Sequence, residues 1–388
     1  MRLVHCIAAL HLDDGGPSRS VSQLAGALAA RGADIHLVTG RDPEKAVVPL
    51  DPRVVVHPVL AGHTTVWRRL RSRGFHKAVS GSLGPGPTVV HTHGVWLRQS
   101  HDAIAAARAA HVPVVLSPRG MLEPWALAYH AWKKRLAWWL YQRRDLRLVT
   151  AFHATAEMEA ESIRRLGFRQ PIIVLPNGVD LPADANRSLP PTGAPREVLF
   201  LSRIHPKKGI NLLLEAWARV RPAGWRLNIA GNDEDGHAAV IGQRVRDLGL
   251  AESVRYVGPA YGEDKERLLR AAQLFVLPSF SENFGIVVAE ALAHGVPVVT
   301  TTGTPWGELH SRRCGWHVPA TSDAITAALA DALARPESEL AAMGAAGRCL
   351  IAERYQWSAI ARQFEEAYAL LGAGAMSRLA ALPFVRVR

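Results

Sequence analysis

Short apolar runs alternate with helix-patterned stretches along the first half of the chain. The runs are continuous rather than alternately apolar and polar, and they are rich in Val, Ile and Ala. Continuous apolar strands between helices are typical of a parallel sheet covered on both faces. The expected strands are Leu3–Leu10, Ile35–Thr39, Val54–Pro58, Thr88–His91, Val114–Ser117, Ala151–Ala154 and Ile172–Leu175, with helices at Ser20–Arg31 and Asp102–Ala110.

The same alternation restarts after Leu181–Pro195, a stretch without periodicity that is rich in Pro and Ala and predicts an interdomain linker. Beyond it we expect strands at Val198–Ser202, Arg226–Ala230, Val254–Val257, Leu274–Pro278 and Val296–Thr301, and helices at Ile210–Arg219, Ala238–Leu248, Lys265–Ala271 and Ile286–Ala293. A chain of 388 residues suits two domains. The pattern therefore predicts an α/β protein with two doubly wound, Rossmann-like parallel-sheet domains, residues 1–180 and 196–356, that face each other across a cleft. The helix Trp357–Leu371 is long enough to return to the first domain, ahead of a basic tail that ends at residue 388.

Composition narrows the class of protein. A hydrophobic content of 48% with 21% charged residues is typical of a folded protein. Residues 1–12 begin like a signal peptide, but the apolar stretch is short and contains His5, so we interpret it as the first buried strand. The three cysteines show no paired spacing, which predicts neither a disulfide framework nor a zinc site. We expect a cytoplasmic location.

The charge is unevenly distributed. Residues 1–180 hold 23 Lys and Arg against 13 Asp and Glu, so a surplus of 10 out of the net +12 lies in the first half. Such a surplus favours an anionic partner, for example a phosphate, a nucleic acid or a membrane surface.

Two carboxylates flank a turn that follows the predicted strand Leu274–Pro278. Glu282 lies ahead of the predicted helix Ile286–Ala293, and Glu290 lies inside it. The backbone amides of Asn283, Phe284 and Gly285 open this helix, where free N–H groups and the helix dipole favour phosphate. A nucleotide sugar fits this pattern, with amides for the diphosphate, one carboxylate for ribose hydroxyls and the other for sugar hydroxyls. The alternative is that Glu282 only caps the helix and Glu290 is a solvated helix residue.

A second group of residues follows the strand Val198–Ser202. Arg203 and Lys208 leave its end at a spacing that lets both cations reach one anion. A solvated basic turn is the alternative. Gly231 ends the next strand, where a nucleoside can pack, although this signal is weak alone.

Taken together, these motifs resemble the family 4 retaining glycosyltransferases of the GT-B fold, in particular the bacterial branch that builds capsule, exopolysaccharide and lipopolysaccharide chains. The resemblance covers essentially the whole chain. It is carried by Gly15-Gly16-Pro17-Ser18, His91-Thr-His-Gly-Val-Trp96, Ser117-Pro-Arg-Gly-Met-Leu-Glu-Pro-Trp125, Pro176-Asn-Gly-Val-Asp180, Arg203 with Lys208-Gly209, and Glu282-x7-Glu290.

The resemblance implies a role for each of these groups. Arg203 and Lys208 would hold the diphosphate of the donor, a UDP- or GDP-sugar. Glu290 would bind the ribose hydroxyls, and Glu282 would act in catalysis by binding donor-sugar hydroxyls near the anomeric carbon. The family uses no cofactor and no divalent metal, because cations and a helix start neutralise the departing nucleotide.

The resemblance also implies backbone contacts. The turn Asn283–Gly285 would contact the sugar and the phosphate, and Gly15 and Gly16 would form a loop of the first domain that closes over the diphosphate.

One position departs from the family. Many members place a His after the strand equivalent to Val114–Ser117, and here Arg119 takes that place. An arginine can hydrogen-bond a sugar or a transition state but cannot act as a base near neutral pH. We therefore expect Arg119 to act in a front-face mechanism, in which the leaving phosphate oxygen takes the acceptor proton. A structural salt bridge is the alternative role for Arg119.

The acceptor side is expected to include His93 and Trp96. His91 and His93 end one strand, and no third ligand lies nearby in the sequence, so a metal pair is disfavoured. For His93 an ordinary hydrogen-bonded loop histidine is the alternative.

Two basic segments account for the charge surplus. Val66–Lys77 places five cations among aromatic residues. The second has an apolar stripe at helical spacing, Trp125, Tyr129, Trp132, Leu136, Trp139 and Leu140, flanked by Lys133, Lys134, Arg135, Arg143 and Arg144. A basic helix with Trp and Leu is typical of an element that lies on anionic lipid, whereas a core stripe with solvated cations is the alternative. Met376–Arg388 is a weaker candidate of the same kind.

These segments suggest a lipid-linked glycan acceptor and peripheral attachment to the inner face of the cytoplasmic membrane. Two other function classes stay open. A nucleotide-sugar 2-epimerase or a glycan phosphorylase would use a similar scaffold, although no motif nominates the Schiff-base lysine of a phosphorylase. A nucleic-acid-binding protein is disfavoured because no nucleic-acid module is visible.

Overall fold

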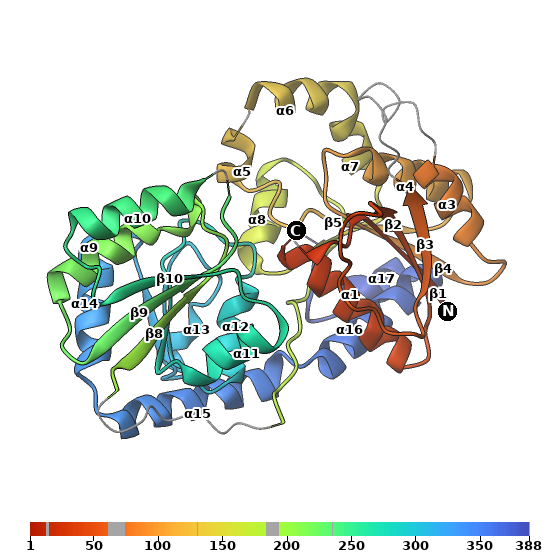
Figure 1. Ribbon diagram of the computed structural model, residues 1–388. Coiled ribbons are helices and arrows are strands. Elements are labelled where there is room, and N and C mark those ends of the chain that lie inside the picture. Colours follow the sequence, from red (N-terminus) through yellow and green to blue (C-terminus); the bar gives the residue numbers. More distant parts are fainter. Residues whose placement is uncertain (13–14, 61–73, 130, 184–193, 235, 388) are drawn as a thin grey trace. The chain divides into compact units, whose positions relative to one another are not determined.

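The computed structural model describes residues 1–12, 15–60, 74–129, 131–183, 194–234 and 236–387. The chain forms two compact units (Figure 1). Unit 1 is Met1–Gly178 together with Trp357–Arg388, and unit 2 is Val179–Gln356. Most of the predicted linker, and residues 66–73 of the first basic segment, lie outside the described residues.

Unit 1 is built on an eight-stranded sheet with the order β14-β7-β6-β5-β4-β1-β2-β3. Its strands are parallel except β14, which pairs antiparallel with β7. The strands are β1 (Arg2–Ala9), β2 (Asp34–Arg41), β3 (Val55–Leu60), β4 (Thr88–His93), β5 (Val114–Ser117), β6 (Ala151–Ala154), β7 (Ile172–Val174) and β14 (Val385–Arg386). The helices are α1 (Gly16–Ala30), α3 (Gly74–Ser82), α4 (Arg98–Ala109), α5 (Pro124–Ala128), α6 (Ala131–Ala137), the π-helix η2 (Trp138–Gln142), α7 (Arg143–Leu148), α8 (Glu157–Arg165), α16 (Trp357–Gly372) and α17 (Met376–Ala380).

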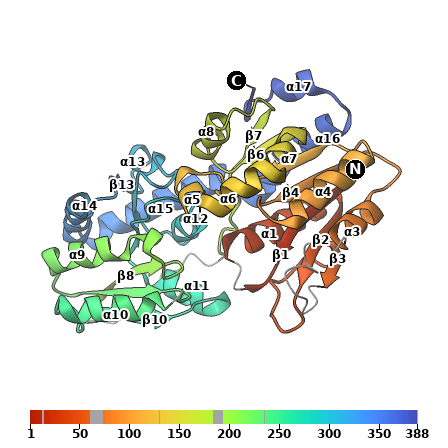
Figure 2. The same cartoon turned by 90° about the horizontal axis from the view of Figure 1, so that it is seen from above.

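Alternating side chains of the continuous strands supply two separate cores in unit 1. On β1, Leu3 and Ile7 pack into the core formed with α1 and α16, whereas Val4 and Cys6 pack into the core formed with α3 and α4. Helices α1 and α16 lie side by side (Figure 2). Both faces of the sheet are therefore covered, as the continuous apolar strands predict.

Unit 2 has a six-stranded, fully parallel sheet with the order β10-β9-β8-β11-β12-β13. The strands are β8 (Arg196–Leu201), β9 (Trp225–Ala230), β10 (Val254–Gly258), β11 (Leu274–Leu277), β12 (Val298–Thr301) and β13 (Gly315–Val318). The helices are the 3-10 helix η3 (Pro206–Lys208), α9 (Ile210–Val220), α10 (His237–Asp247), α11 (Gly262–Ala271), α12 (Ile286–Ala293), α13 (Glu308–Ser311), α14 (Ser322–Ala334) and α15 (Glu337–Arg354). The predicted fold class, two doubly wound parallel-sheet units, is confirmed.

The C-terminal tail is not a free basic segment. Leu379 and Val385 are buried in the unit 1 core, and Arg386 forms an ion pair with Glu157 at 2.5 Å. The tail therefore adds a strand to the sheet of unit 1, and its buried residues Leu379 and Val385 face the core of that unit rather than the outside. Among the helices that the structure describes, none has the length and apolar composition needed to cross a bilayer.

Candidate functional site

The order of the strands creates a switch point in unit 2. From β8 the chain proceeds outward to β9 and β10 on one side, and it returns to β11, β12 and β13 on the other. At such a point the two loops that follow neighbouring strands diverge, and open α/β sheets bind ligands there. The loop after β8 carries Arg203 and Lys208, and the loop after β11 carries Glu282.

Close backbone packing places Lys208 at this point. Gly209 has a φ of 69°, and a Cβ atom there would overlap the carbonyl oxygen of Pro278 at the end of β11. The amide of Phe280 donates to the carbonyl of Lys207 at 2.9 Å. Only glycine permits this approach, so the sequence Lys208-Gly209 fixes the lysine against the β11 loop.

Lys208 and Glu282 form a largely buried ion pair, with 2.6 Å between Nζ and Oε1. The Ser279 hydroxyl also donates to Glu282 Oε1, at 2.6 Å. Burial by itself raises the pKa of Glu282, but the charge of Lys208 and the hydrogen bonds from Lys208 and Ser279 outweigh it and lower that pKa. Glu282 is therefore an anion near neutral pH that can accept hydrogen bonds from hydroxyl groups.

Helix α12 begins beside this pair without a side-chain cap. Its N-cap is Gly285, with a φ of 74°. The Trp306 indole donates to the carbonyl of Phe284 at 2.7 Å, and the Phe284 ring is buried against Trp306 and Tyr355. The turn Asn283–Gly285 is thus held in place by Trp306. The amide of Val288 donates to the Gly285 carbonyl at 2.8 Å, so the amides of Ile286 and Val287 are those of the first turn that can bind an anion.

The other two charged residues predicted to bind the nucleotide-sugar donor, Glu290 and Arg203, have different partners. Glu290 pairs with Lys265 of α11 at 2.8 Å, and Arg203 pairs with Glu234 at 2.8 Å. The structure therefore brings Lys208 and Glu282 together directly but places Arg203 and Glu290 in separate ion pairs. The sequence reading missed Lys265 and Glu234, which lie far along the chain from their partners and carry no motif.

Gly231 has a packing role. Its φ is 150°, and a Cβ atom there would overlap the carbonyl oxygen of Ser202. Tyr256 donates to the Gly231 carbonyl at 2.9 Å. Glycine is required here by the close approach of the ends of β8 and β9.

Unit 1 has its own switch point between β1 and β4, and histidines meet there. Arg119 Nη2 lies 3.2 Å from His93 Nδ1, and His93 Nε2 lies 3.1 Å from His5 Nδ1. Arginine can only donate, so His93 Nδ1 accepts and His93 Nε2 carries the proton that is donated to His5. Burial, reinforced by the charge of Arg119, lowers the pKa of His93 well below its ordinary value and that of His5 to about 3.

A second chain of hydrogen bonds runs behind the first. His153 donates to the Leu175 carbonyl at 2.9 Å, so its Nδ1 accepts from Ser117 at 2.6 Å. Ser117 in turn accepts from His91 Nε2 at 2.6 Å, and His91 Nδ1 accepts from the Tyr368 hydroxyl at 2.6 Å. Each ring is neutral and has a defined tautomer, because burial lowers the pKa of both histidines.

A third histidine, His5 of β1, lies beside His91 and His93, although it is far from them in the sequence. Nitrogen atoms of His5, His91 and His93 lie within 4.8 Å of one another. If a metal ion bound His93 Nε2, the proton on that nitrogen would have to move to His93 Nδ1. That position is blocked because Nδ1 faces the N–H of Arg119. A dication would also lie beside a buried guanidinium. These residues do not fit a metal ion.

Arg119 is buried, and its backbone has a φ of 57°, a strained conformation for a non-glycine residue. It donates to Asn177 Oδ1 at 2.9 Å and to His93 Nδ1 at 3.2 Å, and among the described residues it forms no ion pair with a carboxylate. Burial lowers its pKa to about 10, so it stays a cation near neutral pH. The following loop is fixed by Glu159, which accepts from the amide of Gly120 at 2.7 Å.

The remaining predicted residues of unit 1 lie after a strand and at the start of a helix. Trp96 follows β4 with a φ of 73°, and its amide donates to Gln142 Oε1 at 2.6 Å. Gly15 is the N-cap of α1 with a φ of 83°, and Gly16 is the first residue of that helix. Both strained positions, Trp96 and Arg119, thus lie in loops that follow neighbouring strands.

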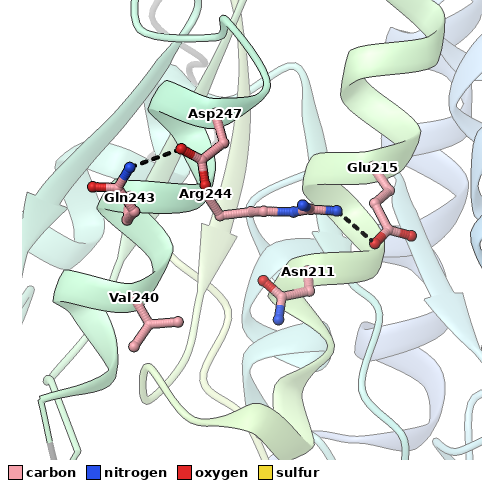
Figure 3. A pocket seen from close by; sticks show the side chains of 6 residues that line it. All are labelled: Asn211, Glu215, Val240, Gln243, Arg244 and Asp247. Carbon is pink, nitrogen blue, oxygen red and sulfur yellow. Dashed lines mark hydrogen bonds and ion pairs between the residues drawn. The ribbon is translucent and has the colours of Figure 1, made fainter.

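A separate hollow of about 470 Å³ lies between α9 and α10 (Figure 3). Within it Arg244 pairs with Glu215 at 3.1 Å, and Gln243 donates to Asp247 at 2.7 Å. It is lined by Asn211, Glu215, Val240, Gln243, Arg244 and Asp247, none of which is a predicted site residue.

The chain is similar to known proteins along most of its length. Residues 15–178 match the family described as "Glycosyl transferase 4-like domain", and residues 195–335 match "Glycosyl transferases group 1". A D-inositol 3-phosphate glycosyltransferase of Mycobacterium sp. (strain KMS) is 30% identical over 352 residues, which cover 82% of this chain and 75% of that protein. A GDP-mannose:cellobiosyl-diphosphopolyprenol alpha-mannosyltransferase of Xanthomonas campestris is 26% identical over 382 residues, which cover 96% of this chain and 98% of that protein. In fold, the chain is similar to sucrose-phosphate synthase from Thermosynechococcus elongatus, with a TM-score of 0.77, 22% identity and coverage of 96% and 100%.

Proposed function

Since this chain belongs to the group 1, 4-like glycosyltransferases, we propose that it moves a hexosyl group from a nucleotide sugar to a lipid-linked glycan with retention of anomeric configuration. A role in the synthesis of a bacterial surface polysaccharide, such as capsule, exopolysaccharide or lipopolysaccharide, is part of this proposal. The relative from Xanthomonas campestris is named for a GDP-mannose donor and a diphosphopolyprenol-linked acceptor, which supports both substrate classes.

The observation that carries the proposal is the Lys208–Glu282 pair beside the uncapped start of α12. The helix start and the lysine supply an anion site for a diphosphate without a metal ion. The ionised carboxylate of Glu282 accepts hydrogen bonds from sugar hydroxyls at the same place. A nucleotide sugar is a ligand that carries both groups next to each other.

Binding of the diphosphate would redistribute the charges of the site. Lys208 would be shared between Glu282 and a phosphate oxygen, and its positive charge would stabilise the leaving nucleotide. Glu290 and Arg203 would contribute to ribose and phosphate binding only after partly leaving Lys265 and Glu234. We propose that they make this exchange on binding.

The proton transfer needs no protein base in this proposal. His93 faces Arg119 with its one lone pair, so it is not free to accept a proton from an acceptor hydroxyl. Glu282 is held in an ion pair and has a lowered pKa, which makes it a weak base. We assign that proton to the leaving phosphate oxygen, and we assign Arg119 a hydrogen-bonding role toward the reacting sugar.

A donor screen tests the proposal. UDP-, GDP- and dTDP-sugars are added in turn, and unfolding is followed by differential scanning fluorimetry; a ligand at 100 times its Kd should stabilise by about 2.7 kcal/mol. The Lys208→Ala variant should lose this shift. The product made from the best donor is then examined by NMR, and an inverted anomeric configuration would refute the retaining mechanism.

A further inference from the structure

One face of unit 1 exposes large apolar side chains in a row. The exposed fractions are 68% for Trp132, 57% for Leu136, 77% for Trp139 and 71% for Leu140. We call these four residues the Trp–Leu face. Trp132 and Leu136 belong to α6, which is labelled in Figure 1, and Trp139 and Leu140 belong to η2, which follows α6. No residue of α5 or α6 is buried. The stripe predicted from the sequence is therefore on the surface, and its interpretation as core is wrong for these four residues.

The two neighbouring tryptophans of η2 have different surroundings. Trp138 packs inward, with its ring 6.1 Å from that of Trp96 and 6.0 Å from that of Phe168. Trp139 is the most exposed residue of the Trp–Leu face. The helix that carries the Trp–Leu face is thus packed against unit 1 through Trp138.

The segment that carries the Trp–Leu face has charged side chains of one sign. Residues 124–144 contain five Lys and Arg and no Asp or Glu. Lys133 lies 5.5 Å from the centre of the Trp132 ring, and Arg143 lies 6.0 Å from that of Trp139. Cations therefore border the apolar residues closely, with no acidic side chain in the segment to neutralise them.

We propose that the Trp–Leu face docks on the surface of an anionic lipid bilayer. Exposed Trp and Leu bordered by Lys and Arg match the boundary between acyl chains and anionic headgroups. A soluble protein rarely leaves such an apolar row uncovered. A second copy of the chain is a poor occupant, because two faces with five cations each would repel one another.

The helix η2, which carries part of the Trp–Leu face, is hydrogen-bonded to a loop of the candidate site. Gln142 accepts from the amide of Trp96, and the Tyr141 hydroxyl donates to the carbonyl of Trp96 at 2.7 Å. Trp96 follows β4, the strand that ends in His93. Docking would hold this loop close to the bilayer surface, where a lipid-linked acceptor presents its glycan. This last step rests on the proposed function, whereas the docking itself does not.

Vesicle flotation with the full chain tests the docking. Vesicles of phosphatidylcholine are compared with vesicles that also contain phosphatidylglycerol. We expect flotation only with the anionic vesicles. Trp132→Ala combined with Trp139→Ala should weaken partitioning at least about tenfold, and Lys133→Gln combined with Arg135→Gln about 30-fold. All four side chains lie on the surface segment, and unchanged thermal unfolding will show that the variants are folded.

A matched control uses Val240→Ala with Arg267→Gln, exposed residues of unit 2, and should float like the wild type. Absence of the wild type from anionic vesicles, or equal flotation of the tryptophan variant, would overturn the proposal. So would a dimer in light scattering that dissociates in the tryptophan variant, since a second copy would then be the occupant. Donor binding in solution is measured separately, so failed docking and failed glycosyl transfer give different results.

Discussion

Lowering the pH from about 7.5 to about 5.5 should destabilise unit 1 through its buried histidines. The folded unit keeps His5, His91, His93 and His153 neutral, and the pKa values of His5 and His153 fall from 6.5 to about 3 because of burial. The unfolded chain takes up protons that the folded chain does not. The free energy of unfolding therefore keeps its full value, as far as these histidines determine it, above pH 6.5. It decreases as the pH falls from 6.5 toward 3.

The size of the effect follows from this difference. At about pH 5.5 His5 and His153 each favour the unfolded state by about 1.4 kcal/mol, because their pKa values fall to about 3, and the lowered pKa values of His91 and His93 act in the same direction. Glu159 acts in the opposite direction, because burial raises its pKa from 4.5 to about 7. Its protonation stabilises the folded state by about 2 kcal/mol over the same interval. His5 and His153 alone therefore leave a net loss of about 1 kcal/mol, which His91 and His93 increase.

Urea unfolding at the two pH values, followed by circular dichroism, measures the loss. Hydrogen exchange, corrected for intrinsic rates, shows which unit loses stability. Peptides from β4 report on unit 1, and peptides from β11 report on unit 2. The His5→Gln variant should reduce the loss by about 1.4 kcal/mol. His5 is a suitable site because its Nε2 has no hydrogen-bond partner among the described residues. Equal stability of the β4 peptides at both pH values would refute the neutral, tautomer-fixed histidines.

Two further changes test the packing that shapes the donor site. Gly231→Ala should destabilise unit 2 by roughly 3 kcal/mol or more, since the new methyl group meets the Ser202 carbonyl; Gly242→Ala, inside α10, should instead be neutral or stabilising in the same urea titration. Trp306→Phe removes the hydrogen bond to Phe284 and should cost about 1–3 kcal/mol while weakening nucleotide binding. Trp316→Phe, which loses a bond to Asp331, serves as its control, and unaltered nucleotide affinity of Trp306→Phe would show that the turn does not depend on this bond.

The strands of both sheets were predictable because most of them are buried on both faces. Continuous runs such as Val114–Ser117 and Ala151–Ala154 have the same bounds in the structure, as does the helix Ile286–Ala293. The missed strands are short and lie at sheet edges. β13 (Gly315–Val318) is only partly buried and mixes Trp and His with Gly and Val, and β14 has two residues. Neither has an apolar run that periodicity can detect.

The candidate site was predictable only at the level of individual residues. Lys208 and Glu282 come together because β8 and β11 are neighbours in the sheet, which a strand-loop-helix pattern suggests. The partners Lys265 and Glu234 depend on how α11 and the β9 loop pack, and no local signal reports that. Likewise His5 joins the β4 histidines only through the pairing of β1 with β4.

The exposure of the apolar stripe was also beyond the sequence. Helical spacing of Trp132, Leu136 and Trp139 is the same whether the face meets a core or the outside. In the structure Trp138 packs against Phe168, whereas Trp139 on the predicted stripe is exposed. The spacing separated the two tryptophans correctly, but it did not show which side of the helix meets the core.

Isothermal titration of UDP and GDP into the wild type and Lys208→Ala tests the central claim most directly. The account predicts that at least one nucleotide binds the wild type and that Lys208→Ala weakens it by about ten- to a hundredfold, as expected for one charge-assisted contact to phosphate. Arg219→Ala, near the far end of α9, should bind like the wild type. Wild-type affinity in Lys208→Ala would contradict the claim that this lysine and the start of α12 hold the diphosphate.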